Sequence, residues 1–445
     1  MKEKIAKQRE LLKKINPMSY DDRMIHLIRL KKALQKYEKE VFAALYEDLR
    51  KTPAEAFATE VGLVYGELKH AIKNLKKWMK PHRVPLALMQ FPGKTFIHHE
   101  PLGQVLIMSP WNYPFLLTMQ PIIGALAAGN VLVVKPSSYS PATSKIMKTI
   151  VEEAFPDGEV LLFLGGRAVN TEIFTYRYDY IFFTGGATVG KIAMEAAAKN
   201  LTPLTLELGG KSPVFITKDA DIPLTVRRLS WGKLINCGQT CVAPDYVLLD
   251  EAIADTFIPL LKQTFEKDLE EMKKLPKIIT SKHYVRLKEN LNQVGIKRYD
   301  DESETILSTI VVNPPLDTLV MSEEIFGPIL PIITYKTLDE AIAFVNEREK
   351  PLALYVYTTS KEIAKKILNE TSSGSMTVND NLMQLANSNL PFGGVGNSGM
   401  GRYHGKKSFE TFSNPKSVLV KSRKFDLVIR YSKDDKAIKT FKKLM

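Results

Sequence analysis

The sequence has few cysteines: only Cys237 and Cys241 occur in 445 residues. A disulfide framework needs more, so the chain is unlike small disulfide-stabilised secreted domains, and we expect a reducing compartment. The N-terminus, MKEKIAKQRELLKK, mixes charged and apolar residues without a continuous apolar segment, which argues against a secretory signal. We therefore expect a cytoplasmic location.

The two cysteines are also too few for a metal site. A structural metal needs about four ligands of cysteine, histidine or carboxylate type. The CxxxC spacing supplies two, and no histidine lies nearby, so we predict no metal. A reducing compartment disfavours a disulfide across this short span. The remaining alternatives are a reactive thiol and the commoner role of a small buried apolar residue.

Charge is absent between Glu100 and Lys135, a stretch long enough to resemble a membrane span. Pro110, Pro114 and Pro121 interrupt it, and a spanning helix must satisfy its own backbone hydrogen bonds. We therefore predict no integral membrane segment. The stretch is instead typical of a buried strand–helix–strand unit, with its elements at Gly103–Met108, Phe115–Ala128 and Val131–Val134.

Basic residues outnumber acidic ones by 13. Nucleic-acid binding is one interpretation. No interleaved aromatic platform or groove-reading motif accompanies the charge, so we predict a solvated lysine-rich surface and no nucleic-acid partner. Residues 416–445 alone carry a net charge of +7. This tail suits transient contact with an acidic membrane surface or a partner, but we favour a solvated terminal helix.

The length predicts two large domains, because single cores stop growing at about 250 to 300 residues. Residues 1–80 show helical spacing with a break at Pro53, and residues 84–100 suggest a short hairpin. Strands and helices then alternate, which is typical of an open parallel sheet. The expected strands are 103–108, 131–134, 160–163, 180–183 and 204–208, and the clearest helices are 141–154 and 189–199.

A second α/β pattern starts near Leu208. It predicts a helix from Asp221 to about Asn236, capped by Gly238, with Cys237 at the frayed end. The further elements are strands at 246–249, 329–335 and 352–358 and a helix at 251–269. Residues 372–405 are rich in glycine, asparagine and serine and indicate an ordered functional loop region.

The segment YDYIFFTGGATVGKIAMEAAAK reads strand, glycine turn, helix. Bare glycine backbone at a helix N-terminus suits a phosphate. The spacing from Gly185 to Gly190 matches neither the usual dinucleotide fingerprint nor a P-loop, so a plain tight turn remains an alternative. Lys135 ends the strand VLVVK, where side chains reach the cofactor crevice of parallel sheets; a solvated lysine is the alternative there.

Four ordered motifs carry a family resemblance. TLELGGKSP, GQTCVAPD, EEIFGPILP and PFGGVGNSGMGRYHG resemble the aldehyde dehydrogenase superfamily over about residues 20–420. SPWNYPF, GQTCVAPDY and GMGRYHGKKSFETFSNPKS are similar to its class 3 branch, of bacterial type. The resemblance implies an α/β fold with a Rossmann-type cofactor domain, an α/β catalytic domain and a small oligomerisation segment.

The resemblance implies three catalytic residues. Cys241 matches the nucleophile, whose thiolate forms a thiohemiacetal with the aldehyde. Asn112 matches the oxyanion-hole side chain, with the Cys241 backbone N–H as second donor. Glu207 matches the general base that activates water to hydrolyse the thioester. A merely structural carboxylate on this apolar strand would be costly to bury, which favours the functional interpretation.

The resemblance also implies an NAD or NADP site. The matching residues are Trp111, Lys135, Gly185, Gly190, Glu324 and Phe326. Ser138 stands in KPSS where many members have a glutamate that accepts from the ribose 2′-hydroxyl. Without that carboxylate a 2′-phosphate meets no repulsion, and Lys135 is free to pair with it. We predict that NADP is used at least as readily as NAD.

Substrate, domains and partners follow from the same resemblance. Tyr113, Trp231 and Phe392 are candidates for an apolar funnel, each with mere core packing as the alternative. Medium- to long-chain aliphatic or aromatic aldehydes are the implied substrates. Cys237 is assigned as a bystander able to trap oxidised Cys241. The expected domains are 1–205 for NAD(P) with an oligomerisation hairpin at 82–102, 206–380 for catalysis, 381–420 for the active-site wall and oligomerisation, and 421–445 as the basic tail.

The function predicted is oxidation of aldehydes to carboxylic acids by a homodimer. An acylating enzyme that passes the thioester to coenzyme A is the first alternative, and Glu207 argues against it because acylation needs no hydrolytic base. A catalytically idle structural or binding protein on the same fold is the second, and the intact Cys241, Asn112 and Glu207 argue against it.

Overall fold

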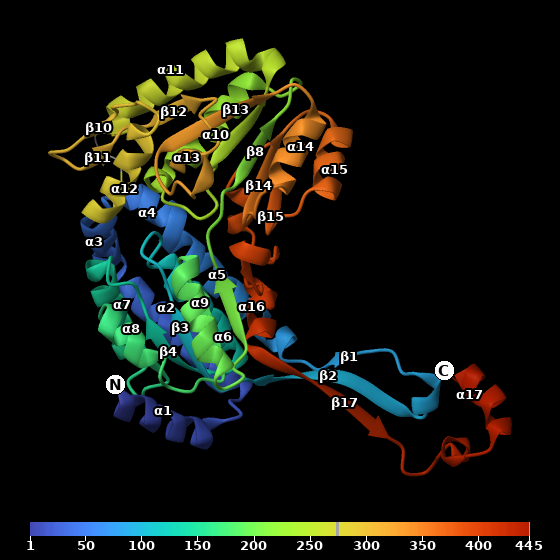
Figure 1. Cartoon of the computed structure of the whole chain (residues 1–445). Coiled ribbons are helices and arrows are strands. Elements are labelled where there is room, and N and C mark those ends of the chain that lie inside the picture. The colour runs from blue at the N-terminus through green and yellow to red at the C-terminus, as the bar shows by residue number, and fades with distance from the viewer. Residues whose placement is uncertain (273–275, 445) are drawn as a thin grey trace.

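The computed structural model describes residues 1–272 and 276–444 and contains two lobes, each built around a six-stranded sheet (Figure 1). A three-stranded arm projects from the lower lobe in this view and carries the C-terminus. The α/β fold class predicted from the sequence is confirmed.

The first sheet has the strand order β16-β7-β6-β3-β4-β5. Its bounds are β3 Gln104–Met108, β4 Val131–Lys135, β5 Val160–Leu162, β6 Tyr180–Thr184, β7 Leu204–Glu207 and β16 Gly399–Met400. All pairs are parallel except β16 with β7. From β3 the chain adds β4 and β5 on one side of the sheet and then β6 and β7 on the other side of β3. The direction in which strands are added therefore switches between the neighbouring strands β3 and β6. Ligands of such sheets bind at the carboxyl ends of the strands on either side of that switch point.

Helices cover this sheet: α6 Leu116–Ala128, α7 Pro141–Ala154, α8 Arg167–Ile173 and α9 Ala187–Ala198. Every residue of α6 is buried, which accounts for the long stretch without charge. Within the chain that the structure describes, no helix combines the length and apolarity required to cross a membrane.

The second sheet is entirely parallel, in the order β12-β13-β9-β8-β14-β15. Its strands are β8 Pro213–Ile216, β9 Tyr246–Asp250, β12 Thr309–Val312, β13 Ile329–Tyr335, β14 Ala353–Tyr357 and β15 Ser375–Val378. Its helices are α10 Ile222–Leu234, α11 Ala254–Met272, α12 Ser281–Asn292, α13 Leu319–Ser322, α14 Leu338–Asn346 and α15 Lys361–Glu370. A short hairpin, β10 Tyr299–Asp300 and β11 Thr305–Ile306, lies beside α12.

The N-terminal residues form helices, as their spacing predicted. These are α1 Lys2–Ile15, α2 Tyr20–Lys36, α3 Glu38–Leu49, α4 Pro53–Ala56 and α5 Gly62–Trp78. A wide π-helical turn, Phe57–Val61, joins α4 to α5. Pro53 is the first residue of α4, where its missing N–H has no intrahelical partner to lose.

The arm pairs segments far apart in the sequence. β1 His82–Arg83 pairs with β2 Gly93–Pro101, which confirms the expected hairpin, and β2 pairs antiparallel with β17 Ser413–Lys421. The helix predicted for residues 416–445 is therefore wrong in its first part, because those residues complete a sheet. The chain ends in α17 Ile438–Leu444, after α16 Gly405–Thr411 has returned it to the first lobe.

Apart from the tail, the predicted strands and helices agree with the structure to within about three residues, but the end of one helix differs for an informative reason. The helix expected to reach Asn236 ends at Leu234, and Asn236 and Cys237 have left-handed backbone φ angles of 51° and 55°. The cause is tertiary: Asn236 donates its N–H to Glu55 and its side-chain amide to the carbonyl oxygens of Asn112 and Gln239. These bonds replace the helical ones.

Candidate active site

Cys241 lies in a turn just before β9, where two cavities meet at its thiol. The side chain is half-buried and free of any disulfide. Burial and the carboxyl groups of Glu324 and Glu207 raise the pKa of this thiol to about 12, while hydrogen bonds from the backbone N–H groups of Cys241 and Val242 act in the opposite direction. Most of the thiol is therefore protonated at neutral pH.

The first cavity, here called the polar cavity, has a volume of ≈ 510 Å³ and lies between the lobes. Residues from the ends of β3, β6 and β7 face residues that precede β9 and β13. Its walls include Trp111, Asn112, Thr184, Gly185, Glu207, Cys241, His283, Arg286, Glu324, Phe326 and Tyr403. Sequence-predicted residues from five separate motifs thus share one space.

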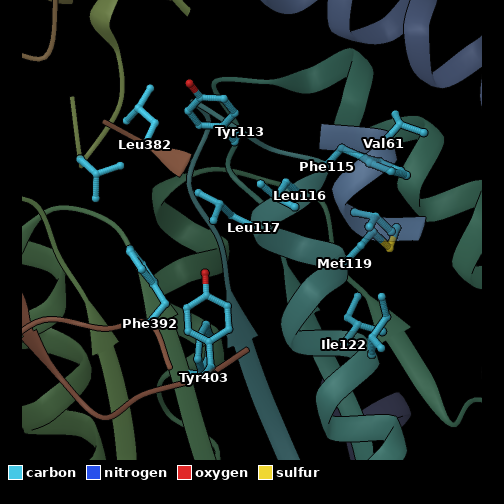
Figure 2. Close-up of a cluster of buried hydrophobic side chains, with 14 of the residues drawn as sticks. Val61, Tyr113, Phe115, Leu116, Leu117, Met119, Ile122, Leu382, Phe392 and Tyr403 are labelled. Carbon is cyan, nitrogen blue, oxygen red and sulfur yellow. The ribbon is translucent and has the colours of Figure 1, made fainter. Parts of the chain in front are cut away.

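The second cavity, here called the apolar cavity, has a volume of ≈ 290 Å³ and is lined almost entirely by carbon. Tyr113 and Phe392 are buried, and Trp231 is 46% exposed at the surface. All three candidates for the apolar funnel belong to its walls, together with Leu63, Leu116, Leu117, Ile235, Leu382, Leu385 and Tyr403. Figure 2 shows four of these buried side chains, with Tyr113 at the top, Leu117 below it, and Phe392 and Tyr403 lowest.

Glu207 ends β7 with its carboxyl group buried, and neither oxygen has a hydrogen-bond partner among the residues that the structure describes. Burial raises its pKa well above the ordinary value, and the guanidinium of Arg402 acts against that shift. An unpaired buried carboxyl destabilises a fold. Since it faces the same cavity as Cys241, its position agrees with a chemical role rather than a packing role.

Asn112 follows β3 on the loop that closes the other side of the polar cavity. It is buried, and its side-chain amide donates to the carbonyl oxygen of Gln239 at 3.0 Å. An amide nitrogen carries two hydrogens, so one donor remains for another acceptor. Asn112 and Cys241 both line the polar cavity.

Glu324 and Phe326 lie on the turn that precedes β13. The Glu324 side chain faces the polar cavity, and no described residue hydrogen-bonds its Oε1. Burial, and next the charge of Asp245, raise the pKa of Glu324 to about 8. Glu323 is exposed, as expected. Phe326 has φ 52°, a strained value for a residue with a side chain, and its ring packs edge-on against Trp111 at 5.4 Å.

This turn is held by residues that the sequence analysis missed. Arg286 of α12 donates to the carbonyl oxygens of Glu324 and Ile325, and Asp245 accepts from the N–H of Ile325 at 3.0 Å. Lys211 pairs with Asp245 at 2.5 Å. Arg286 belongs to no recognisable motif, whereas Lys211 and Asp245 lie inside two motifs and were identifiable from them.

The remaining cofactor candidates lie at the carboxyl edge of the first sheet. Gly185 lines the polar cavity at the start of α9, and a Cβ there would lie 2.8 Å from the ring of Phe183. Gly190 is buried, and a Cβ there would meet Leu208 at 2.9 Å, so it permits close packing of α9. Lys135 ends β4, next to β3; burial lowers its pKa to about 8. Ser138 is exposed three residues later.

The polar cavity fits a dinucleotide. Besides the Glu207 oxygens, Thr184 Oγ1 and Glu324 Oε1 on its walls are buried polar atoms without a hydrogen-bond partner in the described part of the chain. The glycine turn opens α9 without a side chain in the way, which suits a pyrophosphate. Glu324 presents a carboxyl group to the polar cavity, and a carboxyl group is the type of acceptor that ribose hydroxyls use.

Cys237 lies apart from this site. It is 5% exposed and packs in the core of the second lobe with Phe215, Tyr246 and Leu248. Burial raises the pKa of its thiol to about 12. Neither cavity has Cys237 on its wall, so the structure separates the environments of the two cysteines.

Comparisons with known proteins identify the family. The model of the aldehyde dehydrogenase family matches residues 1–418. A 4,4′-diaponeurosporen-aldehyde dehydrogenase of Staphylococcus aureus is 44% identical over 409 residues, which cover 90% of this chain and 89% of that protein. A dimeric NADP-preferring aldehyde dehydrogenase of Rattus norvegicus is 42% identical, with 94% of each chain covered.

Comparison with solved structures supports the same family. The substrate-bound state of Staphylococcus aureus AldH superposes with a TM-score of 0.95 at 40% identity, over 99% of this chain and 98% of that one. The chain therefore belongs to the aldehyde dehydrogenase family. This confirms the class 3-like resemblance and the enzyme class predicted from it, an NAD(P)-dependent aldehyde dehydrogenase.

Proposed function

We propose that this enzyme oxidises medium- to long-chain aliphatic or aromatic aldehydes to carboxylic acids through a covalent intermediate on Cys241. One observation carries the proposal: the thiol lies where the apolar cavity meets the polar cavity. An aldehyde whose chain fills the first presents its carbonyl carbon at the boundary with the second.

In the first step the small fraction of Cys241 that is in the thiolate form adds to the carbonyl carbon, and the carbonyl oxygen takes the negative charge. Asn112 and the backbone N–H of Cys241 donate to that oxygen and stabilise it. As the carbon–oxygen double bond re-forms, the carbon loses its hydrogen with both electrons. A bound oxidised dinucleotide, its nicotinamide half held by Trp111, Glu324 and Phe326, would supply the acceptor. A thioester on Cys241 remains.

In the second step Glu207 accepts a proton from water, and the resulting hydroxide adds to the thioester carbon. The carbon–sulfur bond then breaks, the carboxylic acid leaves and the thiolate is regenerated. The unpaired oxygens of Glu207 in the polar cavity support this role. Transfer of the acyl group to coenzyme A would not require this carboxyl group as a hydrolytic base.

For the cofactor we propose NADP at least as much as NAD. Trp111, Glu324 and Phe326 would hold the nicotinamide half, and Gly185 and Gly190 would form the turn at the pyrophosphate. Lys135 and Ser138 would face the adenosine ribose. The relative from rat is named NADP-preferring, and a 25% identical enzyme from Methanocaldococcus jannaschii was solved with NADP.

The apolar cavity supports a large apolar substrate. The relative from Staphylococcus aureus is named a 4,4′-diaponeurosporen-aldehyde dehydrogenase. Tyr113, Trp231 and Phe392 would contact the chain of such a substrate. The shape of the cavity would select aldehydes by chain length and branching, because its walls carry few polar groups that could bind a polar substituent.

We further propose the domain division 1–205, 206–380 and 381–420 with a basic tail at 421–445, and a homodimer formed through the arm. The arm exposes Leu419 and Val420 on β17, and the rat relative is named dimeric. Sedimentation velocity of the full chain tests this: Leu419→Lys combined with Val420→Lys should convert dimer to monomer. A parent that sediments as a monomer would contradict the dimer.

The decisive test follows nicotinamide reduction by absorbance with aldehydes from acetaldehyde to dodecanal plus benzaldehyde. NAD and NADP run in parallel, without coenzyme A. We expect turnover with both dinucleotides and higher kcat/KM for the longer chains. Turnover that appears only after coenzyme A is added would establish the acylating alternative, and no turnover under either condition would contradict the proposed function.

A further inference from the structure

A fully buried ion pair lies behind the Asn112 loop. Lys51 follows α3, and Glu60 lies in the π-helical turn between α4 and α5. Both side chains are 0% exposed, and Lys51 Nζ donates to Glu60 Oε1 at 2.7 Å. Burying two charges is costly, and replacing such a pair by apolar residues is often neutral or stabilising, so stability alone is a weak reason to keep it.

Lys51 contacts the Asn112 loop directly. Its Nζ donates to the backbone carbonyl oxygen of Asn112 at 3.1 Å and lies 3.9 Å from the centre of the Tyr113 ring. A charged donor forms a stronger hydrogen bond than a neutral one, and an ammonium over an aromatic face adds attraction. One lysine thus holds two consecutive residues, one facing each cavity.

Glu60 holds the continuation of the same loop. Its Oε2 accepts from the N–H of Phe115 at 2.9 Å and of Leu116 at 3.1 Å. These N–H groups open α6, where intrahelical acceptors are missing and a negative charge is favoured. The pair therefore spans the loop: Lys51 fixes its middle and Glu60 fixes its end.

The loop is also tied to the segment that carries Cys241. Asn236 donates to the carbonyl oxygen of Asn112 at 2.8 Å, and the amide of Asn112 donates to Gln239 at 3.0 Å. Tyr113 Oη and Thr240 Oγ1 are 2.7 Å apart. The position of the Asn112 amide relative to the thiol is thus set by contacts that include the Lys51 ammonium.

We propose that Lys51 and Glu60 are positioning residues for catalysis, which hold the Asn112 amide where it donates to the oxygen of the reacting aldehyde. The inference rests on the proposed function, in which Asn112 stabilises that oxygen. An oxyanion donor acts through its preset position, so a loop free to shift loses transition-state stabilisation even when substrate still binds.

The test uses the full-length enzyme with the variant Lys51→Met/Glu60→Gln. This variant removes both charges but keeps an acceptor for the Phe115 and Leu116 N–H groups. Dodecanal oxidation at saturating NADP gives kcat and KM, and thermal melting and NADP binding report the fold. We expect kcat to fall at least tenfold, with KM within threefold, NADP affinity within threefold and a melting temperature close to that of the parent.

Two further variants distinguish a positioning role of Lys51 and Glu60 from a role in general stability. Arg23→Met removes another buried cation that donates to backbone carbonyl oxygens, those of Met18 and Ala127, and should lower the melting temperature without a comparable loss of kcat. Lys51→Arg, which keeps the charge, should recover part of the activity.

A double-mutant cycle with Asn112→Ala completes the test. Adding Lys51→Met/Glu60→Gln to Asn112→Ala should reduce kcat by less than threefold more, because both changes act through one amide. Additive losses, or parental kcat in the Lys51→Met/Glu60→Gln enzyme, would overturn the inference while leaving aldehyde oxidation intact. A parent without aldehyde oxidation would instead refute the proposed function itself.

Discussion

Glu207 and Cys241 face one cavity, and the pKa of the Cys241 thiol is raised by burial, then by the carboxyl group of Glu324 and then by that of Glu207. The two side chains come from different lobes, one at the carboxyl end of β7 and the other just before β9. A carboxylate at Glu207 therefore disfavours the thiolate form of Cys241.

The two cysteines should differ sharply on substitution. Cys241→Ser should lower aldehyde oxidation by at least ~10⁴-fold, since a hydroxyl in this site is a far weaker nucleophile. Cys237→Ala should keep activity within a few-fold because its thiol packs in the core of the second lobe. Steady-state rates measure both, and intact NADP binding by the serine variant is the control. Activity lost in the Cys237 variant alone would reverse the assignment.

Replacing Glu207 should stabilise the protein while stopping hydrolysis. Burial raises the folded-state pKa of Glu207, so the parent loses stability as pH rises through the ordinary carboxyl pKa toward the folded one. Glu207→Gln has no such loss and should be more stable by roughly 1–3 kcal/mol at neutral pH. Melting curves should converge near pH 4. A variant less stable than the parent at neutral pH would contradict this account.

Arg402 should set the pH at which Glu207 works. Its Nη1 and the Glu207 Oε1 both lie within 3 Å of the point that a Cβ on Gly393 would occupy, at 2.9 and 2.8 Å respectively. Burial raises the pKa of Glu207 and the guanidinium opposes that rise, so Arg402→Gln should move the rise of kcat with pH to higher pH.

Four other ionisable groups lie around Glu207. Cys241, Glu324, Tyr180 and Tyr403 also interact with it or share its cavity. We expect a loss of roughly tenfold at neutral pH that disappears at alkaline pH. Arg423→Gln, the same charge change on the exposed tail, is the matched control. Equal losses across the whole pH range would mean that Arg402 acts through structure instead.

Ser138 should control the choice of dinucleotide. Ser138→Glu places a carboxylate where the 2′-phosphate of NADP is proposed to lie and should lower the ratio of kcat/KM for NADP over NAD by about tenfold, or ~1.4 kcal/mol. Ser138→Gln, equal in size but uncharged, should change the ratio much less. An unchanged ratio in the glutamate variant would place the 2′-phosphate elsewhere.

The rim of the apolar cavity should select chain length. Ala386 is exposed on its wall, so Ala386→Trp should lower kcat/KM for dodecanal by roughly tenfold and leave acetaldehyde nearly unchanged. Ala252→Trp, an exposed position on the second lobe, controls for surface tryptophan. Equal effects on both aldehydes would indicate that long chains do not leave through this rim.

Much of the fold was predictable because local patterns carried it. Continuous apolar runs such as Val131–Lys135 become strands buried on both faces, and the charge-free stretch becomes the fully buried α6. β15 and β17 were not predicted, since Ser375–Val378 and Ser413–Lys421 have mixed polarity and are strands only because a distant partner supplies the hydrogen bonds.

Some residues of the candidate site were predictable from the sequence and others were not. Cys241, Glu207, Asn112 and Glu324 lie in recognisable motifs, and the structure places all four around the polar cavity. Lys51, Glu60 and Arg286 belong to no motif, and helical spacing at 1–80 gave no sign that two of them are buried charges. Their roles depend on which backbone groups lie against them.

The sequence by itself determined the α/β class, the family and the residue types of the chemistry, because apolar periodicity and short motifs are properties of neighbouring residues. Only the tertiary structure decided that Asn236 leaves its helix, that one thiol faces the cavities while the other is enclosed, and that the buried Glu207 oxygens accept no hydrogen bond from any described residue. The physical reason is that burial, electrostatic fields and competition for hydrogen bonds arise between residues far apart in the chain. These effects exist only in the folded protein, where the two lobes bring such residues together.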